Sequence, residues 1–316
     1  MRHILLTIDV EDWFQVENFK SCISYDSWPS RELRVERSTH RLLDLLDSSP
    51  LTPPNAKPHP NPASPPTPRA TFFVLAWVAE RIPGLVREIH ARGHEVASHG
   101  CRHELCSGQP REALLQDLIQ SRHILEDITG QVVYGFRAPS FSISEPILEC
   151  IRDAGYQYDS SYNSFSLHGR YGRLFLFPNG NGAHDEALMQ PVENLVEIPI
   201  SNVRLGGRVL PWGGGAYFRL IPERVFRSGV RRILNRQKAY IMYLHPWELD
   251  PEQPRVRKAS VTRKFRHYAN LHKTKTRLKN LITAFSDCAF VICKDYMHQT
   301  RPTPLVSPPR SPQQTP

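Results

Sequence analysis

The feature that most constrains the fold is a series of short apolar segments that alternate with helical patterns along the chain. Such segments, rich in β-branched and aromatic side chains, predict buried strands, and the helices between them predict parallel strands joined by crossovers. In sheets of this kind, functional side chains gather where the strands end. We therefore expect a largely parallel α/β fold, either a barrel or a doubly wound sheet. The polar residues that follow predicted strands are Asp9, His99, Arg137, Asp159 and His245.

The expected elements can be placed by residue ranges. Glycines within 213–218 predict a backbone that approaches another group closely, because glycine has no Cβ. Ser38 and Thr39 are expected to cap the first helix. Strands are predicted at 4–8, 70–75, 93–98, 132–136, 195–200 and 239–244. Helices are predicted at 38–46, 82–91, 111–128, 145–154 and 222–234.

Two histidines separated by three residues, His99 and His103, form the clearest ligand pattern. Their imidazoles can converge on one point if the segment is helical or turns sharply, and neutral imidazole is a common ligand of zinc-like metals. The predicted strand that ends just before His99 would give the pair a rigid base. The alternative is two unrelated surface histidines. The HExxH pattern is absent, because Gly100 follows His99.

Carboxylates follow the first predicted strand at once, as Asp9, Glu11 and Asp12. Buried carboxylates are costly unless a cation compensates them, so we expect a metal ion or an arginine nearby. On a strand, Asp9 and Glu11 share one face, and Asp12 joins them only after a turn. A solvated loop is the alternative for this segment.

Taken as one site, these side chains are suited to metal-assisted hydrolysis of an amide or an ester. The two histidines and one carboxylate would form a three-ligand metal site with an open position. Asp9 is the candidate base, and Arg137 would hold it ionised and oriented. His245 is the candidate acid, and Asp159 is expected to orient it through its other ring nitrogen. Considered singly, Arg137 could instead be a surface charge, His245 a core histidine and Asp159 a turn residue.

In their order and spacing, five short motifs resemble the polysaccharide deacetylases of the NodB type, carbohydrate esterase family 4. The resemblance covers residues 1–250 and implies a distorted (β/α) barrel of about seven strands. It also implies a metal-dependent hydrolase that removes N-acetyl groups from sugars and uses a divalent metal, with zinc as the leading candidate. The five motifs are Thr7-Ile8-Asp9-Val10-Glu11-Asp12, Ser98-His99 to His103, Arg137-Ala138-Pro139, Asp159, and Leu244-His245.

The chain departs from the family pattern at two motifs. The first motif lacks the usual Asp-Asp pair, so the carboxylate ligand is either Asp12 or Glu11, and we slightly prefer Asp12. The Asp159 motif lacks the tryptophan that accompanies it in the family. Substrate contacts are expected from the motif residues and from aromatic faces that stack on pyranose rings. The candidate substrate-binding residues are Pro139, Phe141, Trp212, Tyr217, Leu244 and Trp247.

More narrowly, the chain resembles the subgroup linked to exosortase and PEP-CTERM exopolysaccharide loci. The subgroup resemblance extends to about residue 285. It implies one deacetylase domain over residues 1–285, with a subgroup-specific extension over about 250–285. The subgroup implies a bacterial, cytoplasmic protein that acts on an N-acetylated exopolysaccharide or its precursor. The matching stretches are 9–14, 70–73, 213–218, 245–248 and 265–271.

Composition sets the remaining expectations. No apolar stretch of the 316 residues approaches the roughly 20 residues that span a bilayer, and the start is not a signal peptide, so we expect a soluble, cytoplasmic protein. The proline-rich segment 48–69 and the tail 300–316 are expected to be disordered. Six cysteines without a CxxC pattern are expected to be reduced thiols.

Three rival functions follow from the same residues. A cyclic amide or imide hydrolase on a related fold would have a small closed pocket instead of a wide groove. A barrel that binds polysaccharide without turnover would have a broken site, but every catalytic position is filled here. The net charge is +9, and the segment 255–279 is strongly basic. This segment could attract an acidic polymer or a phosphate-linked sugar, or it could be only the solvated face of a helix. Nucleic-acid binding rests on charge alone and is not expected, and the oligomeric state stays open.

Overall fold

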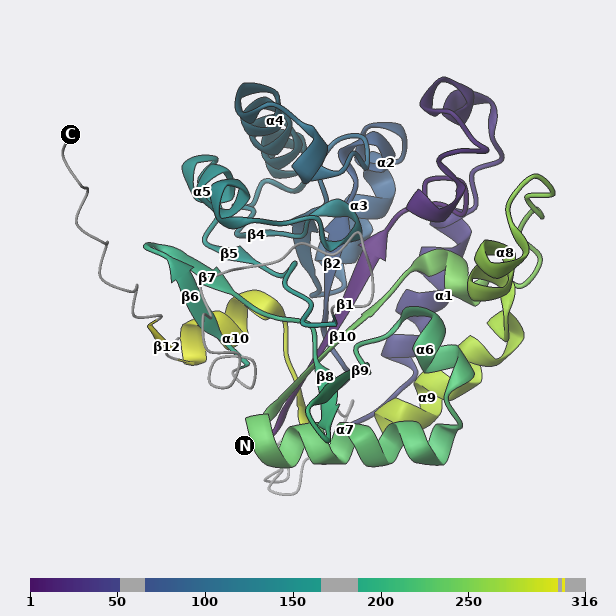
Figure 1. The fold of residues 1–316 in the computed structure, drawn as a ribbon, viewed down its shortest axis with the longest axis vertical. Coiled ribbons are helices and arrows are strands. Elements are labelled where there is room, and N and C mark those ends of the chain that lie inside the picture. Colours follow the sequence, from purple (N-terminus) through teal and green to yellow (C-terminus); the bar gives the residue numbers. More distant parts are fainter. Residues whose placement is uncertain (52–65, 166–186, 301–302, 305–316) are drawn as a thin grey trace.

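The computed structural model describes residues 1–51, 66–165, 187–300 and 303–304, and its centre is one curled sheet (Figure 1). The strands of this sheet are β1 (His3–Val10), β2 (Ala70–Val74), β3 (Glu95–Ser98), β4 (Gly135–Phe136), β5 (Tyr158–Asp159), β6 (Met189–Val192), β7 (Leu195–Glu197), β10 (Ala239–Leu244), β11 (Ala289–Phe290) and β12 (Thr303–Pro304). A separate hairpin consists of β8 (Asn202–Leu205) and β9 (Arg208–Pro211).

The strand order explains how distant parts of the sequence meet. The path runs β10-β1-β2-β3-β4-β5-β7-β6-β12, and β11 pairs with the start of β1. From β10 to β7 all neighbouring pairs are parallel, so their carboxyl ends lie at one rim. Within the described residues this parallel part has seven strands, as expected for the curled α/β barrel.

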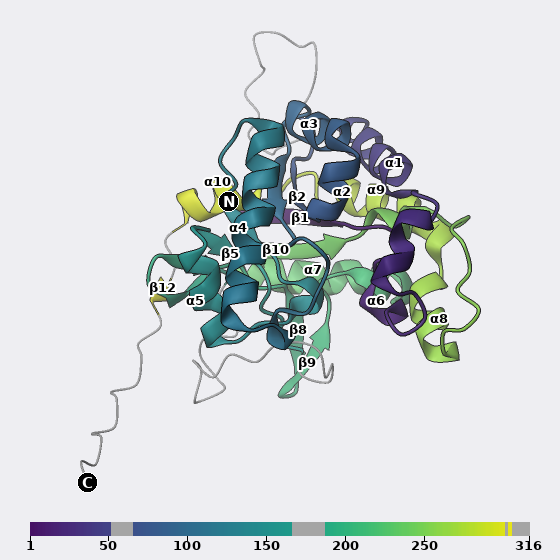
Figure 2. The same ribbon diagram turned by 90° about the horizontal axis from the view of Figure 1, so that it is seen from above.

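Helices surround the outer face of the sheet (Figures 1 and 2). They cover the apolar side chains that the strands direct outward, which gives the layered arrangement of an α/β barrel. The helices are α1 (Val35–Asp47), α2 (Ala76–Arg81), α3 (Pro83–Ala91), α4 (Arg111–Thr129), α5 (Glu145–Asp153), α6 (Gly215–Leu220), α7 (Glu223–Gln237), α8 (Val261–Tyr268), α9 (Thr274–Ala284) and α10 (Cys293–Gln299).

Strand β1 shows how alternation builds both the core and the site. Its even-numbered residues, from Ile4 to Val10, belong to the larger apolar cluster between sheet and helices. Leu5, on the other face, belongs to a second cluster inside the curl, which also contains Phe73 and Ile241. Successive side chains of a strand point to opposite faces, so Thr7 and Asp9 continue the inner row toward the rim. The same strand therefore fills the core and delivers a carboxylate to the rim.

Glycines let the curl close between β7 and β10. Gly214 has φ of +137° and forms a parallel bridge with Tyr243, and a Cβ there would lie 1.9 Å from the Tyr243 carbonyl oxygen. Ser201 also contacts β10, because its backbone N–H donates to Ile241 O at 3.2 Å. The close approach expected for residues 213–218 is confirmed at Gly214.

The start of α1 differs from the sequence-based expectation. The helix begins at Val35, and Ser38 and Thr39 are buried inside it. The carboxylate of Asp12 accepts hydrogen bonds from the backbone N–H groups of Arg34 and Val35 at 2.7 and 2.9 Å. A side chain from the end of β1 thus caps the helix, so no local cap is needed.

Most of the two segments expected to be disordered lies outside the described residues, at 52–65 and in the tail after residue 300. Among the described residues, none of the helices is both long and apolar enough to cross a membrane. All six cysteines are free thiols, as expected.

Candidate active site

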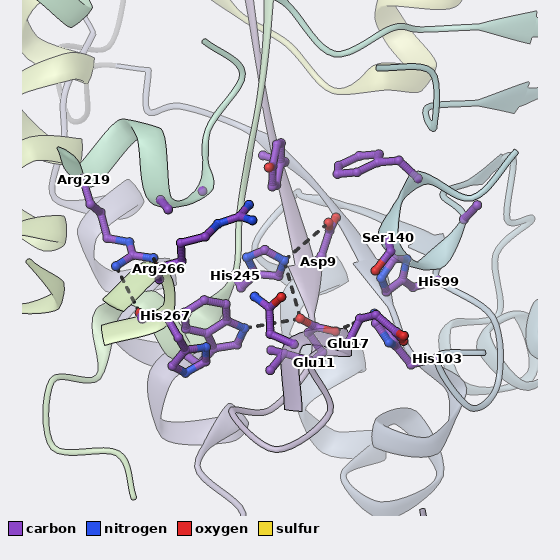
Figure 3. Close-up of a pocket in the computed structure, with 18 residues that line it drawn as sticks. Asp9, Glu11, Glu17, His99, His103, Ser140, Arg219, His245, Arg266 and His267 are labelled. Carbon is purple, nitrogen blue, oxygen red and sulfur yellow. Dashed lines mark hydrogen bonds and ion pairs between the residues drawn. The ribbon is translucent and has the colours of Figure 1, made fainter. Parts of the chain in front are cut away.

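The carboxyl ends of the parallel strands surround a cavity of about 120 Å³ (Figure 3). Asp9 and Glu11 come from the end of β1, His99 and His103 from the segment after β3, and His245 from the residue after β10. All five line the cavity, and all but His245 are buried. The rule that functional groups gather at strand ends therefore holds for these residues.

Glu11, His99 and His103 form a group that could hold a metal ion. One ligand atom from each lies within 4.8 Å of the other two. His103 returns toward His99 through a sharp turn, because Gly100 and His103 have φ of +77° and +53°. The Nδ1 atom of His99 lies 2.8 Å from the Arg137 carbonyl oxygen, which orients the ring and leaves Nε2 for a ligand. Burial lowers the pKa of His99 to about 4, so the imidazole is neutral, as a metal requires.

The slight preference for Asp12 as the carboxylate ligand is corrected by the geometry. The carboxylate of Asp12 accepts hydrogen bonds from three backbone N–H groups, those of Trp13, Arg34 and Val35. Glu11, the alternative, is the carboxylate that lies with the two histidines. The strand parity that places Glu11 on the same face as Asp9 was the informative signal.

Glu11 provides a test of whether the site suits a cation. Its Oε2 atom is buried and lies 2.8 Å from His103 Nε2. Burial opposes ionisation of this carboxyl, but the neighbouring imidazoles, His103 foremost, outweigh burial and lower the pKa to about 2. A buried, ionised carboxylate next to two imidazoles fits a divalent metal.

Asp9 is held by Arg137, as the sequence predicted. The guanidinium Nη1 of Arg137 donates to Asp9 Oδ1 at 2.7 Å and to Thr7 Oγ1 at 2.7 Å. Its Nε and Nη2 donate to the carbonyl and hydroxyl of Ser160, each at 2.8 Å. Arg137 is fully buried, and the ring of Phe73 lies 4.1 Å below its guanidinium carbon. The second oxygen of Asp9, Oδ2, lies 3.9 Å from His245 Nε2.

His245 is oriented by a residue that the sequence analysis did not single out. Its Nδ1 lies 2.9 Å from Glu248 Oε1, within the short turn Pro246–Leu249, while its Nε2 faces Glu11 Oε1 at 3.5 Å. Burial alone would lower the pKa of His245, but the hydrogen bond to Glu248 and the nearby carboxylates raise it to about 9. His245 is therefore protonated at neutral pH in the metal-free protein.

Glu248 is in turn paired with a buried arginine. Arg219 Nε donates to Glu248 Oε2 at 2.7 Å, and both side chains are almost fully buried. The other guanidinium nitrogens of Arg219 donate to the carbonyl oxygens of Arg266, His267 and Ala269. One arginine thus connects the carboxylate behind His245 to the end of α8.

Asp159 does not orient His245, which corrects the sequence-based assignment. It accepts hydrogen bonds from the hydroxyl and backbone N–H of Ser161 at 2.7 and 3.1 Å. It also contacts Glu197, and burial raises the pKa of both carboxyls, so that the pair holds a proton. Ser161 Oγ accepts from Ala138 N at 2.7 Å, so this pair supports the backbone after Arg137.

The substrate-binding predictions are partly supported. Phe141 and Trp247 line the cavity, together with Tyr243, whose ring centroid lies 4.9 Å from that of Phe141. The loop carrying Ser140 and Phe141 has φ of +53° and +59° at these two residues, an uncommon conformation that directs them toward the cavity.

The other predicted contacts lie elsewhere. Trp212 packs face to face on Phe226 and donates to its carbonyl, so it belongs to the core under α7. Leu244 is buried in the larger apolar cluster, because it is one residue out of phase with Tyr243 on β10. Pro139 is buried and does not line the cavity, and Tyr217 packs on Phe165 and does not line it either.

A column of stacked rings forms one wall of the cavity. His245 stacks on Trp247 at 4.9 Å between centroids, and Trp247 stacks on His267 at 4.1 Å. Trp247 Nε1 also donates to Glu11 Oε1 at 3.3 Å. The pKa of His267 is lowered well below its ordinary value by burial and by Arg219, so this ring is neutral. The column fixes His245 against the carboxylates of β1.

Two family models match the chain. The model described as polysaccharide deacetylase matches residues 67–158, and one described as a domain of unknown function, DUF3473, matches residues 160–298. A peptidoglycan-N-acetylglucosamine deacetylase of Bacillus cereus is 30% identical over 88 residues, which are 28% of this chain and 41% of that protein. A peptidoglycan deacetylase of Helicobacter pylori is 29% identical over 99 residues, 31% of this chain and 34% of that protein. The chain thus spans less than half the length of these relatives.

Solved structures show the same fold. A protein of Mycobacterium smegmatis assigned to the polysaccharide deacetylases has a TM-score of 0.56 at 18% identity, covering 96% of this chain and 92% of that one. A structure described as T48 deacetylase with substrate has a TM-score of 0.50 at 12% identity, covering 96% and 94%. Residues 67–158 thus match the polysaccharide deacetylase model, and the solved structures show that the chain has the fold of these proteins.

Proposed function

We propose that this protein is a metal-dependent deacetylase that removes N-acetyl groups from an exopolysaccharide or its precursor in the bacterial cytoplasm. The observation that carries the proposal is that one cavity contains both a set of candidate metal ligands and a candidate base and acid. Glu11, His99 and His103 form the candidate metal ligands, and the Asp9 carboxylate and His245 imidazole lie directly beside them. Hydrolysis of an unreactive amide needs all of these functions in one place.

The proposed reaction adds water across the amide bond. A divalent cation held by Glu11, His99 and His103 would polarise the acetyl carbonyl and favour deprotonation of water. Asp9 accepts the proton of the attacking water at Oδ2, since Arg137 occupies Oδ1. The bond from water oxygen to the carbonyl carbon forms, and the bond from that carbon to nitrogen then breaks. The products are acetate and a free amine.

His245 supplies the proton that the leaving amine needs. Glu248 occupies its Nδ1, so Nε2 carries the proton that faces the cavity. In the metal-free protein, the raised pKa of His245 keeps that proton in place at neutral pH. Arg137 pairs with the carboxylate of Asp9 at 2.7 Å. The proposed base, Asp9, is thus paired with an arginine, and the proposed acid, His245, with a glutamate.

The substrate class is inferred from the relatives and the subgroup resemblance. The relatives are named for peptidoglycan or its N-acetylglucosamine. Phe141, Tyr243 and Trp247 give the cavity aromatic walls of the kind that stack on sugar rings. The subgroup link, the extension over 250–285 and the exopolysaccharide substrate belong to the proposal.

Release of acetate from N-acetylglucosamine oligomers tests the proposal, with metal content measured in parallel. We expect the His99→Ala variant to lose both metal and turnover, and the His245→Ala variant to keep metal but lose turnover. His90→Ala, which removes an exposed histidine on α3, is the matched control and should match the native protein. Full turnover in the His245→Ala variant would refute the assigned role.

A cyclic amide hydrolase is a second candidate, favoured by the modest cavity of about 120 Å³ and by the displacement of Trp212 and Tyr217 from it. Parallel assays on a hydantoin and on N-acetylglucosamine oligomers separate the two. Ring opening without acetate release would replace the deacetylase proposal.

A further inference from the structure

Helix α8 presents its apolar side to solvent. Val261 is 79% exposed and Phe265 is 58% exposed, and the two lie one turn apart on the same face. On the opposite face, His267 is buried against Trp247 and Phe19. This arrangement is the reverse of an ordinary surface helix, which buries its apolar stripe and exposes its polar one.

The helix is held in this orientation by buried contacts. Arg219 donates hydrogen bonds to the carbonyl oxygens of Arg266, His267 and Ala269 at the end of α8. Arg263 on its first turns donates to Ser21 Oγ at 2.9 Å, which ties the helix to the segment after β1. Rolling α8 to bury Val261 and Phe265 would break these contacts. The exposed pair is therefore a fixed feature of the surface.

Positive charge surrounds the exposed pair. Residues 253–286 contain ten lysines and arginines and neither aspartate nor glutamate. Arg255, Arg257 and Lys258 lie exposed in the loop that precedes α8. That loop is tied to the helix, because Lys264 Nζ donates to Arg257 O and Val256 N donates to the Tyr268 hydroxyl. Cations and apolar side chains therefore form one continuous surface, which we name the α8 face.

We propose that the α8 face, made of Arg255, Arg257, Lys258, Val261 and Phe265, docks on an anionic lipid bilayer. The two apolar side chains could insert at the boundary of the acyl chains, while the cations beside them contact the acidic headgroups. Nucleic acid would use the cations and leave Val261 and Phe265 in water. A neutral protein partner would leave the cations unpaired. A bilayer with acidic headgroups satisfies both parts of the surface.

The position of α8 gives this docking a consequence for the site. The helix lies at the periphery of the molecule in both views (Figures 1 and 2). Its residues Arg266 and His267 also line the cavity, as the close-up shows (Figure 3). Docking through the α8 face would hold the cavity close to the headgroups. A glycan attached to the membrane could then reach it without leaving the surface.

Cosedimentation of the full chain with vesicles tests the proposal. The vesicles are phosphatidylcholine alone, or phosphatidylcholine mixed with phosphatidylglycerol, at low and at physiological salt. We expect binding only to the anionic vesicles and weaker binding at higher salt. The double variant Val261→Ser with Phe265→Ser should lose roughly tenfold or more in affinity. Arg257→Gln with Lys258→Gln should lose roughly 25-fold, because each cation contributes about fivefold.

The matched control replaces two exposed apolar residues elsewhere, Val132→Ser with Leu205→Ser, both 60% exposed in the native chain. It should bind vesicles like the native protein. Equal losses in the control and in the α8 variant would overturn the proposal, as would absence of binding to anionic vesicles. A native dimer in size-exclusion chromatography that the Val261 and Phe265 changes convert to a monomer, without vesicle binding, would assign the face to a second copy instead.

Discussion

Replacing Glu248 by glutamine tests the carboxylate behind His245. Glu248 Oε1 lies 2.9 Å from His245 Nδ1, and the pKa of His245 is about 9 with this partner present. A hydrogen bond to a charged group contributes about 1.5–3 kcal/mol, and one pKa unit corresponds to about 1.4 kcal/mol. The Glu248→Gln change should therefore lower the pKa of His245 by about 1–2 units. It should stay above 6.5, because Glu11 and Asp9 still face Nε2.

The same change also affects stability. Arg219 donates to Glu248 Oε2 at 2.7 Å from a buried position, so glutamine leaves its charge without an anion. Breaking a buried ion pair costs about 3–5 kcal/mol, and the glutamine oxygen retains one hydrogen bond, so we expect the lower end of that range.

The pKa of His245 can be measured in metal-free protein by NMR titration of labelled histidine, with His245→Gln used to assign the signal. Asp159→Asn is the control, because Asp159 bonds to Ser161 instead of to the imidazole. A pKa of His245 that is unchanged in Glu248→Gln, or that falls equally in Asp159→Asn, would refute the reasoning. Chemical denaturation of both variants reports the stability.

Three further predictions concern other parts of the chain. Metal titration should show that Glu11→Gln abolishes tight metal binding and that Asp12→Asn keeps it. Asp12→Asn should instead lower the free energy of unfolding by about 1–3 kcal/mol, because Asp12 caps the start of α1. A loss of metal binding in Asp12→Asn alone would restore Asp12 as the ligand. Burial lowers the pKa of His94 from 6.5 to about 4. Between these two pH values the unfolded chain binds more protons than the folded chain, so the free energy of unfolding falls by about 3 kcal/mol as pH drops from 6.5 to 4. In His94→Asn this part of the pH dependence should vanish from denaturation curves; an unchanged slope would show that His94 is not its source. Gly214→Ala should cost about 3 kcal/mol, because the new Cβ meets the Tyr243 carbonyl oxygen, and a native melting curve would contradict this contact.

The alternation of strands and helices was enough to predict a largely parallel α/β sheet and the rim at which Asp9, His99 and His245 meet, and the family resemblance added the curled form of the barrel. The rule applies because parallel strands end on one side of a sheet whatever their sequence. It does not give the direction of each side chain beyond the strand end. Asp159 occupies such an end but turns toward Ser161 and Glu197, so its role was misassigned.

Contacts set by tertiary packing could not be predicted. Arg219 reaches Glu248 across 29 positions of sequence, and nothing in its local pattern marks it as buried. Glu248 itself carried a signal, because a residue three positions after His245 can fold back onto it in a tight turn. The preference for Asp12 ignored strand parity, which grouped Glu11 with Asp9.

Trp212 shows a second limit. Trp212 was assigned to the sugar site because its aromatic face could stack on a pyranose ring. In the structure it packs against Phe226 of α7 and donates a hydrogen bond to the Phe226 carbonyl. Aromatic composition near a motif therefore does not separate a stacking surface from a core contact.

The most direct measurement is an anomalous-scattering map of crystals grown with zinc or cobalt. The account predicts one strong peak bounded by Glu11, His99 and His103 and adjacent to Asp9. A peak at Asp12, or an empty group of the three residues while metal binds elsewhere, would contradict it.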